Sequence, residues 1–259
     1  FMVSEEVAVF DNLKNKLHLI ILIDSEDDRD IAERRLDELE EKLKEPLKFQ
    51  DFKKPEKTIN ESDFISGFGE DEFKNSVERA KKYIEEGDIM QVVCSQRMSI
   101  PFTADPVALY RSIRQLNPSP YMYYLNLHDF HIVGSSPEIL ARLEDNKVTV
   151  RPIAGTRRRG KDDSDDLAME KDMVNDPKEI AEHLMLIDLG RNDVGRVAKP
   201  GTVNVTEQFG IERYSHVMHM VSNVEAELKD GLSAIDLFKA TFPAGTVSGA
   251  PKILSLIHI

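Results

Sequence analysis

The segment Phe242–Lys252, FPAGTVSGAPK, combines glycine and proline residues with two hydroxyl side chains and a lysine. Gly245 and Gly249 allow the backbone to turn tightly and to approach a ligand closely. Pro251 suits the first position of a helix, where free N–H groups favour an anion. Taken alone, the segment could also be an ordinary surface turn between two elements.

Two glutamates and a histidine share one face of a predicted helix. Residues three and four apart lie on the same helix face, so Glu179, Glu182 and His183 point roughly the same way. Two carboxylates on one face repel each other unless a cation lies between them. Because Mg²⁺ prefers oxygen ligands and commonly binds one or two carboxylates while keeping waters, the pattern indicates a magnesium site. An ordinary solvated helix face is the alternative interpretation.

The segments GSSPE and PIAGTRRRG place polar groups beside predicted strands. Glu138 follows a tight polar turn, and an acid in a partly dry pocket has a raised pKa and can act as a general acid. It could instead begin a helix after Pro137. A strand end delivers Gly155 and Thr156, whose backbone N–H groups and hydroxyl could hold a carboxylate. Arg157–Arg159 follow and, taken alone, indicate a solvated basic turn.

Other polar residues give weaker indications. His216 and His219 lie three apart, so in a strand they face opposite sides and at most one enters a given site. Histidine is nevertheless the side chain best suited to proton transfer near neutral pH. Cys94 sits in an alternating apolar stretch, which favours a buried small side chain over a nucleophile. Four polar residues follow an apolar turn, where burial would require partners: Asp188, Arg191, Asn192 and Asp193.

A mixture of helices and strands must position these residues. We expect helices over residues 27–43, 71–86, 105–116, 176–189 and 233–240, the fourth with Gly190 at its end. We expect strands over residues 17–23, 88–100, 121–127, 131–134, 148–153, 203–205 and 214–228, the last of which could also be helical. Residues 49–69 indicate a long connection, and residues 162–166 an acidic solvated loop. The elements do not alternate regularly, so we predict an α+β fold with large antiparallel sheets.

The composition argues against several classes of function. The chain has 259 residues and a net charge of -13, so nucleic-acid binding has no electrostatic support. No apolar run approaches the roughly 20 residues of a membrane span, and no signal peptide opens the sequence. A single cysteine rules out an internal disulfide, and the cytoplasm is the natural compartment.

Together these segments resemble the chorismate-utilising enzymes, and most closely the large subunits of anthranilate synthases (component I). Six motifs match that family's order and spacing over roughly residues 50 to 253: GDIMQVVCSQR, GSSPE, PIAGTRRRG, EIAEHLMLIDLGRNDVGRV, YSHVMHMVSNV and FPAGTVSGAPK. The resemblance implies a chorismate-binding fold of two large antiparallel sheets flanked by helices, with the active site between two interleaved subdomains. It also implies a reaction in which ammonia, supplied by a glutamine amidotransferase subunit (component II), adds to chorismate bound with Mg²⁺. The 4-hydroxyl then leaves, and loss of pyruvate makes the ring aromatic.

The resemblance assigns roles to the polar residues described above. Glu182, with Glu179 beside it, matches the carboxylate pair at the Mg²⁺ site. Gly155 and Thr156 match the pair that binds the ring carboxylate of chorismate. Glu138 matches the acid that helps the hydroxyl to leave.

The remaining assignments come from the last two motifs. His219 matches the histidine that assists loss of pyruvate by taking the ring proton. Thr246 belongs to a loop that faces the substrate, and we also expect substrate contacts from Gly245, Gly249 and Lys252.

Two positions distinguish products within the family. Relatives that make 4-amino-4-deoxychorismate often carry a nucleophilic lysine where Ala154 stands, and isochorismate-forming relatives carry a water-activating lysine near Gln91. Alanine cannot attack, and glutamine is a poor base, so both positions favour anthranilate synthase. The alternatives are the large subunit of an aminodeoxychorismate synthase and an inert fragment of the chorismate fold.

The resemblance also suggests boundaries. Residues 1–48 correspond to a remnant of an N-terminal subdomain, 49–70 to a linker and 71–253 to the catalytic domain, whereas 254–259 resemble a non-native tail. Family members continue beyond SGAPK with a segment that includes another Mg²⁺ glutamate, and they carry an N-terminal segment for tryptophan feedback. We therefore expect an incomplete chain with little or no activity by itself.

Overall fold

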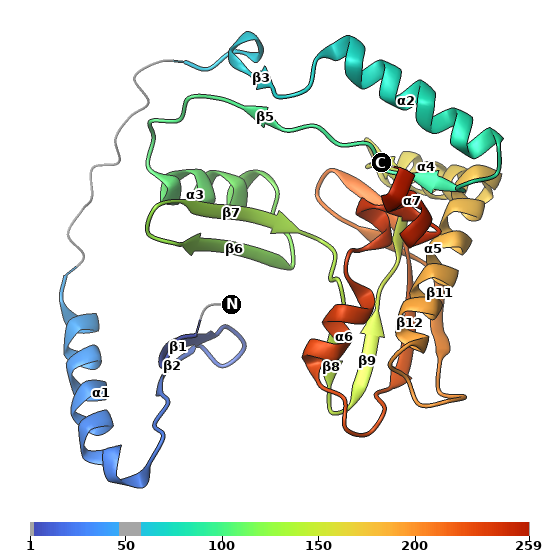
Figure 1. Cartoon of the computed structure of the whole chain (residues 1–259). Helices are drawn as coiled ribbons and strands as arrows, with labels where there is room; N and C mark the ends of the chain where they lie inside the picture. Colours follow the sequence, from blue (N-terminus) through green and yellow to red (C-terminus); the bar gives the residue numbers. More distant parts are fainter. Residues whose placement is uncertain (1–2, 47–57, 259) are drawn as a thin grey trace. The chain divides into compact units, whose positions relative to one another are not determined.

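The computed structural model describes residues 3–46 and 58–258. The chain divides into two compact units, Phe1–Phe52 and Lys53–Ile259 (Figure 1). The boundary predicted between residues 48 and 49 lies outside the described residues. The later part of the predicted linker is described, and it contains the short elements η2 (Glu61–Asp63) and β3 (Ile65–Ser66).

The first unit is a hairpin followed by a helix. β1 (Glu6–Asp11) pairs with β2 (Lys16–Ile21), and η1 (Glu26–Asp28) leads into α1 (Arg29–Lys44). These bounds confirm the strand and the helix predicted in this region to within a few residues. Arg35 on α1 binds Glu6 on β1, with Nε 2.6 Å from the carboxylate oxygen. None of the described residues of this unit is fully buried.

The second unit is built on one antiparallel sheet of five strands (Figure 1). The strands are β8 (Arg142–Glu144), β9 (Lys147–Val150), β10 (Ile153–Arg158), β11 (Asn204–Arg213) and β12 (Val217–Glu227). β12 is central: β10 and then β9 pair along one of its edges, and β11 pairs along the other. Alternation along β12 sends Met218, Met220, Ser222 and Val224 to one face and His219 and Asn223 to the opposite face.

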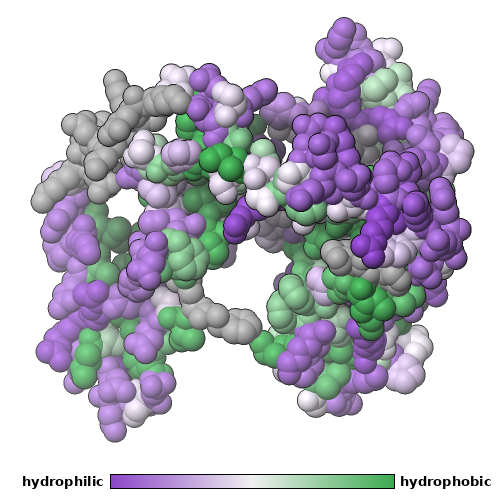
Figure 2. All heavy atoms as spheres, turned by 45° about the horizontal axis from the view of Figure 1, so that its top comes forward, coloured by the Kyte–Doolittle hydropathy of each residue, from purple (hydrophilic) through white to green (hydrophobic). Residues whose placement is uncertain are grey.

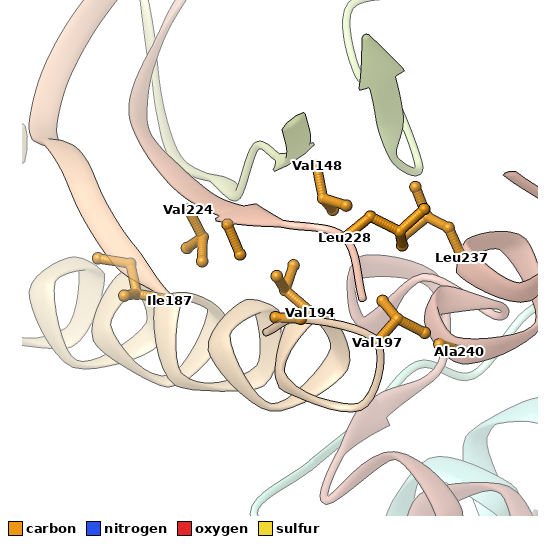
Figure 3. Packing of buried hydrophobic residues seen from close by; sticks show 10 residues of the cluster. Val148, Ile187, Val194, Val197, Val224, Leu228, Leu237 and Ala240 are labelled. Carbon is orange, nitrogen blue, oxygen red and sulfur yellow. The ribbon is translucent and has the colours of Figure 1, made fainter. Parts of the chain in front are cut away.

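Helices cover the first of these faces. They are α4 (Asp163–Asn175), α5 (Pro177–Gly195) and α6 (Ala234–Thr241). Figure 3 shows Val148 and Val224 of the sheet pointing toward Ile187 and Val194 of α5. A second apolar cluster lies under α4 and contains Met173, Met218 and Met220. The core is therefore a helix layer packed on one side of a sheet.

Shorter elements complete the second unit. The helices are α2 (Glu70–Glu85), α3 (Pro106–Leu116), η3 (Gly245–Val247) and α7 (Lys252–His258). The strands are β4 (Gln91–Val92), β5 (Met98–Ser99), β6 (Tyr121–Asn126), β7 (His131–Ser136) and β13 (Gly249–Ala250). Figure 2 shows hydrophobic residues on the visible surface among hydrophilic ones, and large apolar side chains such as Met90, Leu184 and Ile253 are exposed.

The α+β class is confirmed, but the sheets are smaller than expected. Within the described residues there are one sheet of five strands and four ladders of two strands, not two large sheets. The strand predicted over residues 88–100 is reduced to β4 and β5. Residues 203–205 and 214–228 fall largely within β11 and β12, so the helical alternative is wrong.

Two predictions, a loop over residues 162–166 and a helix end at Gly190, are wrong for identifiable reasons. Residues 162–166 are not a loop, because the Asp162 side chain accepts a hydrogen bond from the Asp165 N–H and caps α4. Gly190 does not end α5, which continues to Gly195. A Cβ built on Gly190 would lie 3.5 Å from side-chain atoms of Val150, Pro152 and Val224, an ordinary packing distance, so this position is an interior helix residue that faces the sheet.

Candidate active site

The strand pair β10–β12 brings together three of the predicted site residues. Thr156 pairs with His219, and the register shifts between Ala154 and Thr156, leaving Gly155 with a φ of 76°. Such a backbone conformation favours glycine. His219 Nδ1 lies 3.0 Å from Thr156 Oγ1 and 3.3 Å from the Gly155 carbonyl oxygen. The predicted carboxylate-binding pair and the predicted base are therefore neighbours.

These contacts fix the tautomer of His219. A carbonyl oxygen can only accept, so Nδ1 carries the hydrogen and donates toward Gly155 and Thr156. In the neutral ring, Nε2 then keeps the lone pair and is the atom that can take a proton. Because Thr156 Oγ1 accepts from Nδ1, its own O–H remains able to donate to an anion.

Glu179 is held by an arginine rather than exposed on a solvated face. The Arg157 guanidinium lies 3.2 Å from Glu179 Oε1, 2.6 Å from Asp172 and 2.9 Å from Asp176. It also donates to the Thr156 carbonyl at 3.1 Å. The prediction of a solvated basic turn is therefore wrong for Arg157, because acids from α4 and α5 surround it.

Glu182 is the more available of the two predicted metal ligands. Its side chain is 32% exposed and its Oε2 is 3.7 Å from Lys178 Nζ, whereas the Glu179 side chain is 13% exposed. The two acids lie near the start of α5, on the helix side of the sheet. A Cβ built on Gly155 would lie 3.5 Å from Glu179 Oε2, so the bulge is where the strand meets this acidic helix end.

Glu138 and Thr246 form a second group. Thr246 Oγ1 donates to Glu138 Oε1 at 3.1 Å. Burial raises the pKa of Glu138, and this hydrogen bond opposes the rise. Glu138 lies in irregular structure after β7 and does not begin a helix. A small hollow is lined by Glu138, Thr246 and Gly245 together with Arg151 and Pro152, which lead into β10.

The loop that carries Thr246 is anchored by a buried ion pair. Lys252 Nζ lies 2.5 Å from Asp193 Oδ2 and 2.7 Å from the Thr241 carbonyl oxygen. The side chains of Lys252 and Asp193 are only 5% and 7% exposed. Asp193 belongs to the set of polar residues for which the sequence required a partner if buried, and Lys252 is that partner. The Lys252 ammonium is thus occupied by the protein itself.

The two glycines of this loop also have protein neighbours. A Cβ built on Gly245 would lie 1.8 Å from Leu189 Cδ2, and one built on Gly249 would lie 2.2 Å from the Gln91 carbonyl oxygen. Gly249 therefore needs glycine, because backbone atoms approach it and its φ is 140°, whereas a Cβ at Gly245 would require the Leu189 side chain to move. Their predicted substrate contacts stay a prediction.

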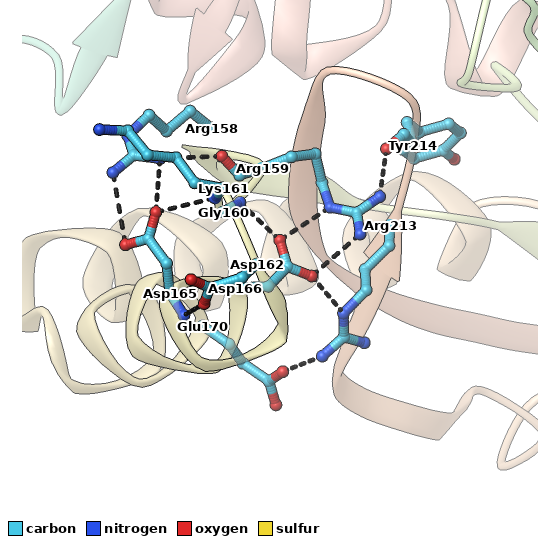
Figure 4. A network of polar contacts seen from close by, with 10 residues as sticks. All are labelled: Arg158, Arg159, Gly160, Lys161, Asp162, Asp165, Asp166, Glu170, Arg213 and Tyr214. Carbon is cyan, nitrogen blue, oxygen red and sulfur yellow. Dashed lines mark hydrogen bonds and ion pairs between the residues drawn. The ribbon is translucent and has the colours of Figure 1, made fainter.

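A polar network joins the end of β10 to α4 and β11 (Figure 4). Arg159 Nε lies 2.9 Å from Asp166 Oδ1, and Arg159 also donates to the Tyr214 carbonyl at 2.7 Å. The Arg159 hydrogen bond, followed by the Gly160 N–H, lowers the pKa of Asp166 to about 2. Arg158 lies 3.0 Å from Asp165. The second and third arginines of the motif thus fix the strand end.

Other predicted residues have structural positions. His183 is fully buried, with Nε2 2.7 Å from Ser222 Oγ, and burial lowers its pKa to about 4. It therefore faces the sheet rather than the acids of α5. His216 is exposed in the turn before β12. Cys94 is half-buried rather than buried.

The predicted residues thus gather in two groups along α5. Near its start, Glu179 approaches the Gly155 backbone on the helix side of the sheet, whereas the Thr156 and His219 side chains contact each other on the opposite face. Glu138 and Thr246 lie beside its later turns, next to Leu189 and Gly190. Within residues 3–46 and 58–258, no cluster of three or more side chains is placed to bind a metal ion. No helix in the same ranges has the length and apolar character that a membrane crossing requires.

Three residues that no sequence motif indicated surround His219 on the open face of the sheet, namely Arg151, Glu212 and Tyr214. Glu212 pairs with His219 across β11 and β12. The proximity of Glu212 to His219 follows once residues 204–213 and 217–227 are known to form a hairpin. The sequence pattern did not reveal the first of these strands in full, because its bulges interrupt the alternation of polar and apolar residues.

Comparison with known proteins places this geometry in a family. The family model for chorismate binding enzymes matches residues 1–259. Anthranilate synthase component 1 of Neisseria meningitidis serogroup B is 54% identical over 261 residues, covering 98% of this chain and 52% of that protein. The protein of the same name from Pseudomonas aeruginosa is 55% identical over 264 residues, with the same coverage of 98% and 52%. The chain thus spans about half the length of these relatives.

Solved structures show the same fold. Anthranilate synthase component I from Streptococcus pneumoniae has a TM-score of 0.86 and 38% identity, over 98% of this chain and 56% of that chain. The menaquinone-specific isochorismate synthase from Escherichia coli has a TM-score of 0.74 at 20% identity, over 95% of this chain and 56% of that chain, which indicates the fold alone. The family match over the whole length, together with the strand-borne Gly155–Thr156–His219 arrangement, leads to one conclusion. The chain belongs to the chorismate-binding enzyme family.

Proposed function

We propose that this chain carries part of the active site of an anthranilate synthase, which converts chorismate and ammonia to anthranilate, pyruvate and water. The observation that carries the proposal is the contact of His219 Nδ1 with Thr156 Oγ1 and the Gly155 carbonyl. This contact places the base His219 next to the Thr156 hydroxyl and the Gly155 backbone, which can donate hydrogen bonds to a carboxylate. The 47–55% identity to proteins named anthranilate synthase component 1 supports the same assignment.

In this proposal the chain's own residues bind the ring and move two protons. The Thr156 hydroxyl and the backbone at Gly155 bind the ring carboxylate. Burial raises the pKa of Glu138 and so favours its protonated form, from which it gives a proton to the departing 4-hydroxyl, which leaves as water. Ammonia supplies the new C–N bond. The added nitrogen then loses one proton. His219 takes the ring proton at Nε2, and the electrons of that C–H bond make the ring aromatic as the C–O bond to the enolpyruvyl group breaks. The released enolpyruvate takes up the proton lost by the nitrogen and becomes pyruvate.

A divalent cation is the cofactor that we propose, and the donor set on α5 fits Mg²⁺. Mg²⁺ commonly takes one or two carboxylates and keeps waters or substrate oxygens, so two glutamates suffice on the protein side. Glu182 is the primary ligand because its oxygens are the less engaged ones. Glu179 is the second, held at Oε1 by Arg157 and near Gly155 at Oε2. When bound, the ion offsets the negative charge of the substrate carboxylates beside these acids.

Two features favour direct amination of the ring. Ala154 is buried in β10 and offers no nucleophile for a covalent intermediate. Gln91 is a poor base and lies in β4, with its Oε1 buried and without a hydrogen-bond partner among the described residues. We further propose that a glutamine amidotransferase subunit supplies the ammonia and that the enzyme acts in the cytoplasm.

The primary test is calorimetric binding of chorismate with Mg²⁺, because the chain spans about half the length of its relatives. Gly155→Ala strains a left-handed residue beside Glu179 and should abolish binding. Gly201→Ala is the matched control, because Gly201 has a similar φ of 80° and nothing near its added Cβ. Equal binding by both variants would contradict the proposed site.

A second measurement separates the possible products. The chain, supplied with chorismate, Mg²⁺ and ammonium, is assayed for anthranilate fluorescence, and the product mass is determined. Anthranilate supports the proposal, and 4-amino-4-deoxychorismate replaces it with the other amination reaction. Tight chorismate binding with no turnover identifies a binding fragment.

A further inference from the structure

A polar cluster covers the sheet face opposite the helices, around the candidate base His219. β11 and β12 form a hairpin in which Glu212 lies directly across from His219. Side chains of such cross-strand pairs lie on the same face within about 5 Å of each other at Cβ. Arg151, from the turn between β9 and β10, reaches the same face.

The contacts of Glu212 fix its carboxylate. Arg151 binds it through both terminal guanidinium nitrogens, one of them 3.2 Å from Oε2, and the Tyr214 hydroxyl donates to Oε2 at 2.7 Å. Arg151 Nε also donates to Asn223 Oδ1 at 3.2 Å. A planar guanidinium held by three contacts has little freedom to rotate, so the acid it binds is fixed as well.

Tyr214 connects this acid to the histidine. Its ring lies 5.6 Å from the His219 ring at an interplanar angle of 63°, an edge-to-face arrangement. Burial and the Glu212 carboxylate raise the pKa of Tyr214 to about 12, so the phenol keeps its hydrogen and remains a donor. Arg151 therefore binds Glu212, Glu212 accepts the hydrogen bond of the Tyr214 hydroxyl, and the Tyr214 ring packs against the His219 imidazole.

The charges are consistent with these contacts. Burial would raise the pKa of Glu212, but the hydrogen bonds from Arg151 and Tyr214 and the nearby charges of Arg151 and His219 outweigh it, and the net pKa is lowered. Glu212 is therefore a carboxylate at neutral pH. The charge of His219 is one of the contributions that favour the Glu212 carboxylate, so the two groups lie within electrostatic reach of each other.

We propose that Glu212 is a positioning residue for His219. Its carboxylate, fixed by Arg151, holds the Tyr214 ring against the imidazole and favours the imidazolium that forms when Nε2 takes a proton. Nδ1 meanwhile stays committed to Gly155 and Thr156. The catalytic part of this inference rests on the proposed function, whereas the effect on the imidazole can be measured without any substrate.

The test substitutes the acid without changing its shape. Glu212→Gln can still accept hydrogen bonds from Arg151 and Tyr214 but carries no charge. Glu207→Gln is the matched control, because Glu207 accepts from Asn223 on the same face at 2.8 Å and does not pair with His219. Among the described residues, this face of the sheet presents Arg151, Glu207, Glu212 and Tyr214 near His219, and Arg158 lies opposite Val217, two residues before His219.

The first readout is the nuclear magnetic resonance titration of the His219 ring nitrogens in the substrate-free chain. Because the substitution removes a negative charge beside the imidazole, we expect the titration curve to move to lower pH in Glu212→Gln and to stay unchanged in Glu207→Gln. Tyr214→Phe keeps the ring contact but loses the phenol hydrogen bond, so a smaller shift in the same direction is expected. Identical titration curves in wild type and Glu212→Gln, with the fold intact by circular dichroism, would overturn the inference.

The second readout is turnover of chorismate. We expect kcat of Glu212→Gln to fall about tenfold or more with KM unchanged, as for a group that acts in the transition state rather than in binding. If the wild-type chain does not bind chorismate, the proposed function fails while the titration still decides the role of Glu212. A shifted titration with unchanged kcat in an active chain refutes the catalytic part.

Discussion

Removing the cation from the Asp193–Lys252 pair is predicted to destabilise the second unit strongly. Lys252→Met keeps much of the side-chain volume but leaves the Asp193 carboxylate buried without its ammonium partner. Asp193 Oδ1 already has no hydrogen-bond partner among the described residues, so the charge of Arg196, which is not hydrogen-bonded to Asp193, would be the main remaining compensation. The Thr241 carbonyl oxygen also loses its donor from Lys252.

The burial of the Asp193–Lys252 pair determines how much stability Lys252→Met should lose. The side chains are 5% and 7% exposed, so the pair belongs with buried ion pairs rather than surface ones. Breaking a buried pair by removing one partner costs about 3–5 kcal/mol, because an uncompensated charge remains inside. For a domain of this size, each kcal/mol lowers the midpoint of thermal unfolding by roughly 2–4 °C, so a loss of about 6–20 °C is expected.

Replacing both partners should recover part of this loss. In Asp193→Leu/Lys252→Met no charge is left in the interior, and such replacements are often close to neutral. The Thr241 carbonyl still lacks its donor, so about 1–3 kcal/mol of destabilisation should remain. The double variant is therefore expected to be more stable than Lys252→Met alone.

Urea unfolding followed by circular dichroism measures these differences. Lys199→Met is the control, since Lys199 pairs at the surface with Asp230, whose side chain is 93% exposed, and little or no change is expected there. If Lys252→Met unfolds at the same urea concentration as Lys199→Met, the pair does not stabilise the loop and our reasoning about its burial is wrong.

Three further predictions concern titratable groups. His183 has its pKa lowered by burial to about 4, so the unfolded chain binds the extra proton and stability should fall by about 3 kcal/mol between roughly pH 6.5 and pH 4; urea unfolding of His183→Gln should lack this slope. Asp166 has its pKa lowered to about 2 by Arg159, so it contributes stability above about pH 3.8 that is lost as the pH falls toward 2; acid unfolding of Asp166→Asn should show a flatter curve there. Thr246→Val removes a hydrogen bond that lowers the pKa of Glu138, so the infrared titration of that carboxyl should move to higher pH.

Local sequence signals predicted several parts of the fold and the site. The start of α5 was predicted because Asp176-Pro177 combines a capping side chain with a residue suited to the first turn, and the Asp176 side chain does accept from the Lys178 N–H. Because Asp193 follows an apolar turn, the sequence indicated that this side chain would need a partner if it were buried. Both signals depend only on residues close together in the chain.

The signals that failed depend on tertiary packing. Gly190 resembles a helix terminator in the sequence, yet it lies inside α5, where the helix packs against Val150, Pro152 and Val224 of the sheet region. Arg157 reads as a solvated residue until Asp172, Asp176 and Glu179 are brought around it. A short stretch of sequence cannot show that three acids from α4 and the start of α5 meet the end of β10. The positive charge of Arg157 alone therefore led to the wrong prediction that this side chain is solvated.

The structure suggests why one helix carries so many of the family's motif residues. α5 presents Glu179 to the bulge at Gly155 near its start, and Asp193 to the loop of Thr246 near its end. Between them, His183 Nε2 contacts Ser222 Oγ on β12, and the same oxygen accepts from the Phe209 N–H of β11. The helix is thus hydrogen-bonded to the hairpin that carries His219. A shift of α5 along the sheet would therefore move the predicted metal ligands and the loop of Thr246 together relative to His219. For this reason, we expect substitutions in the middle turns of α5 to change both the stability of the second unit and its ligand binding.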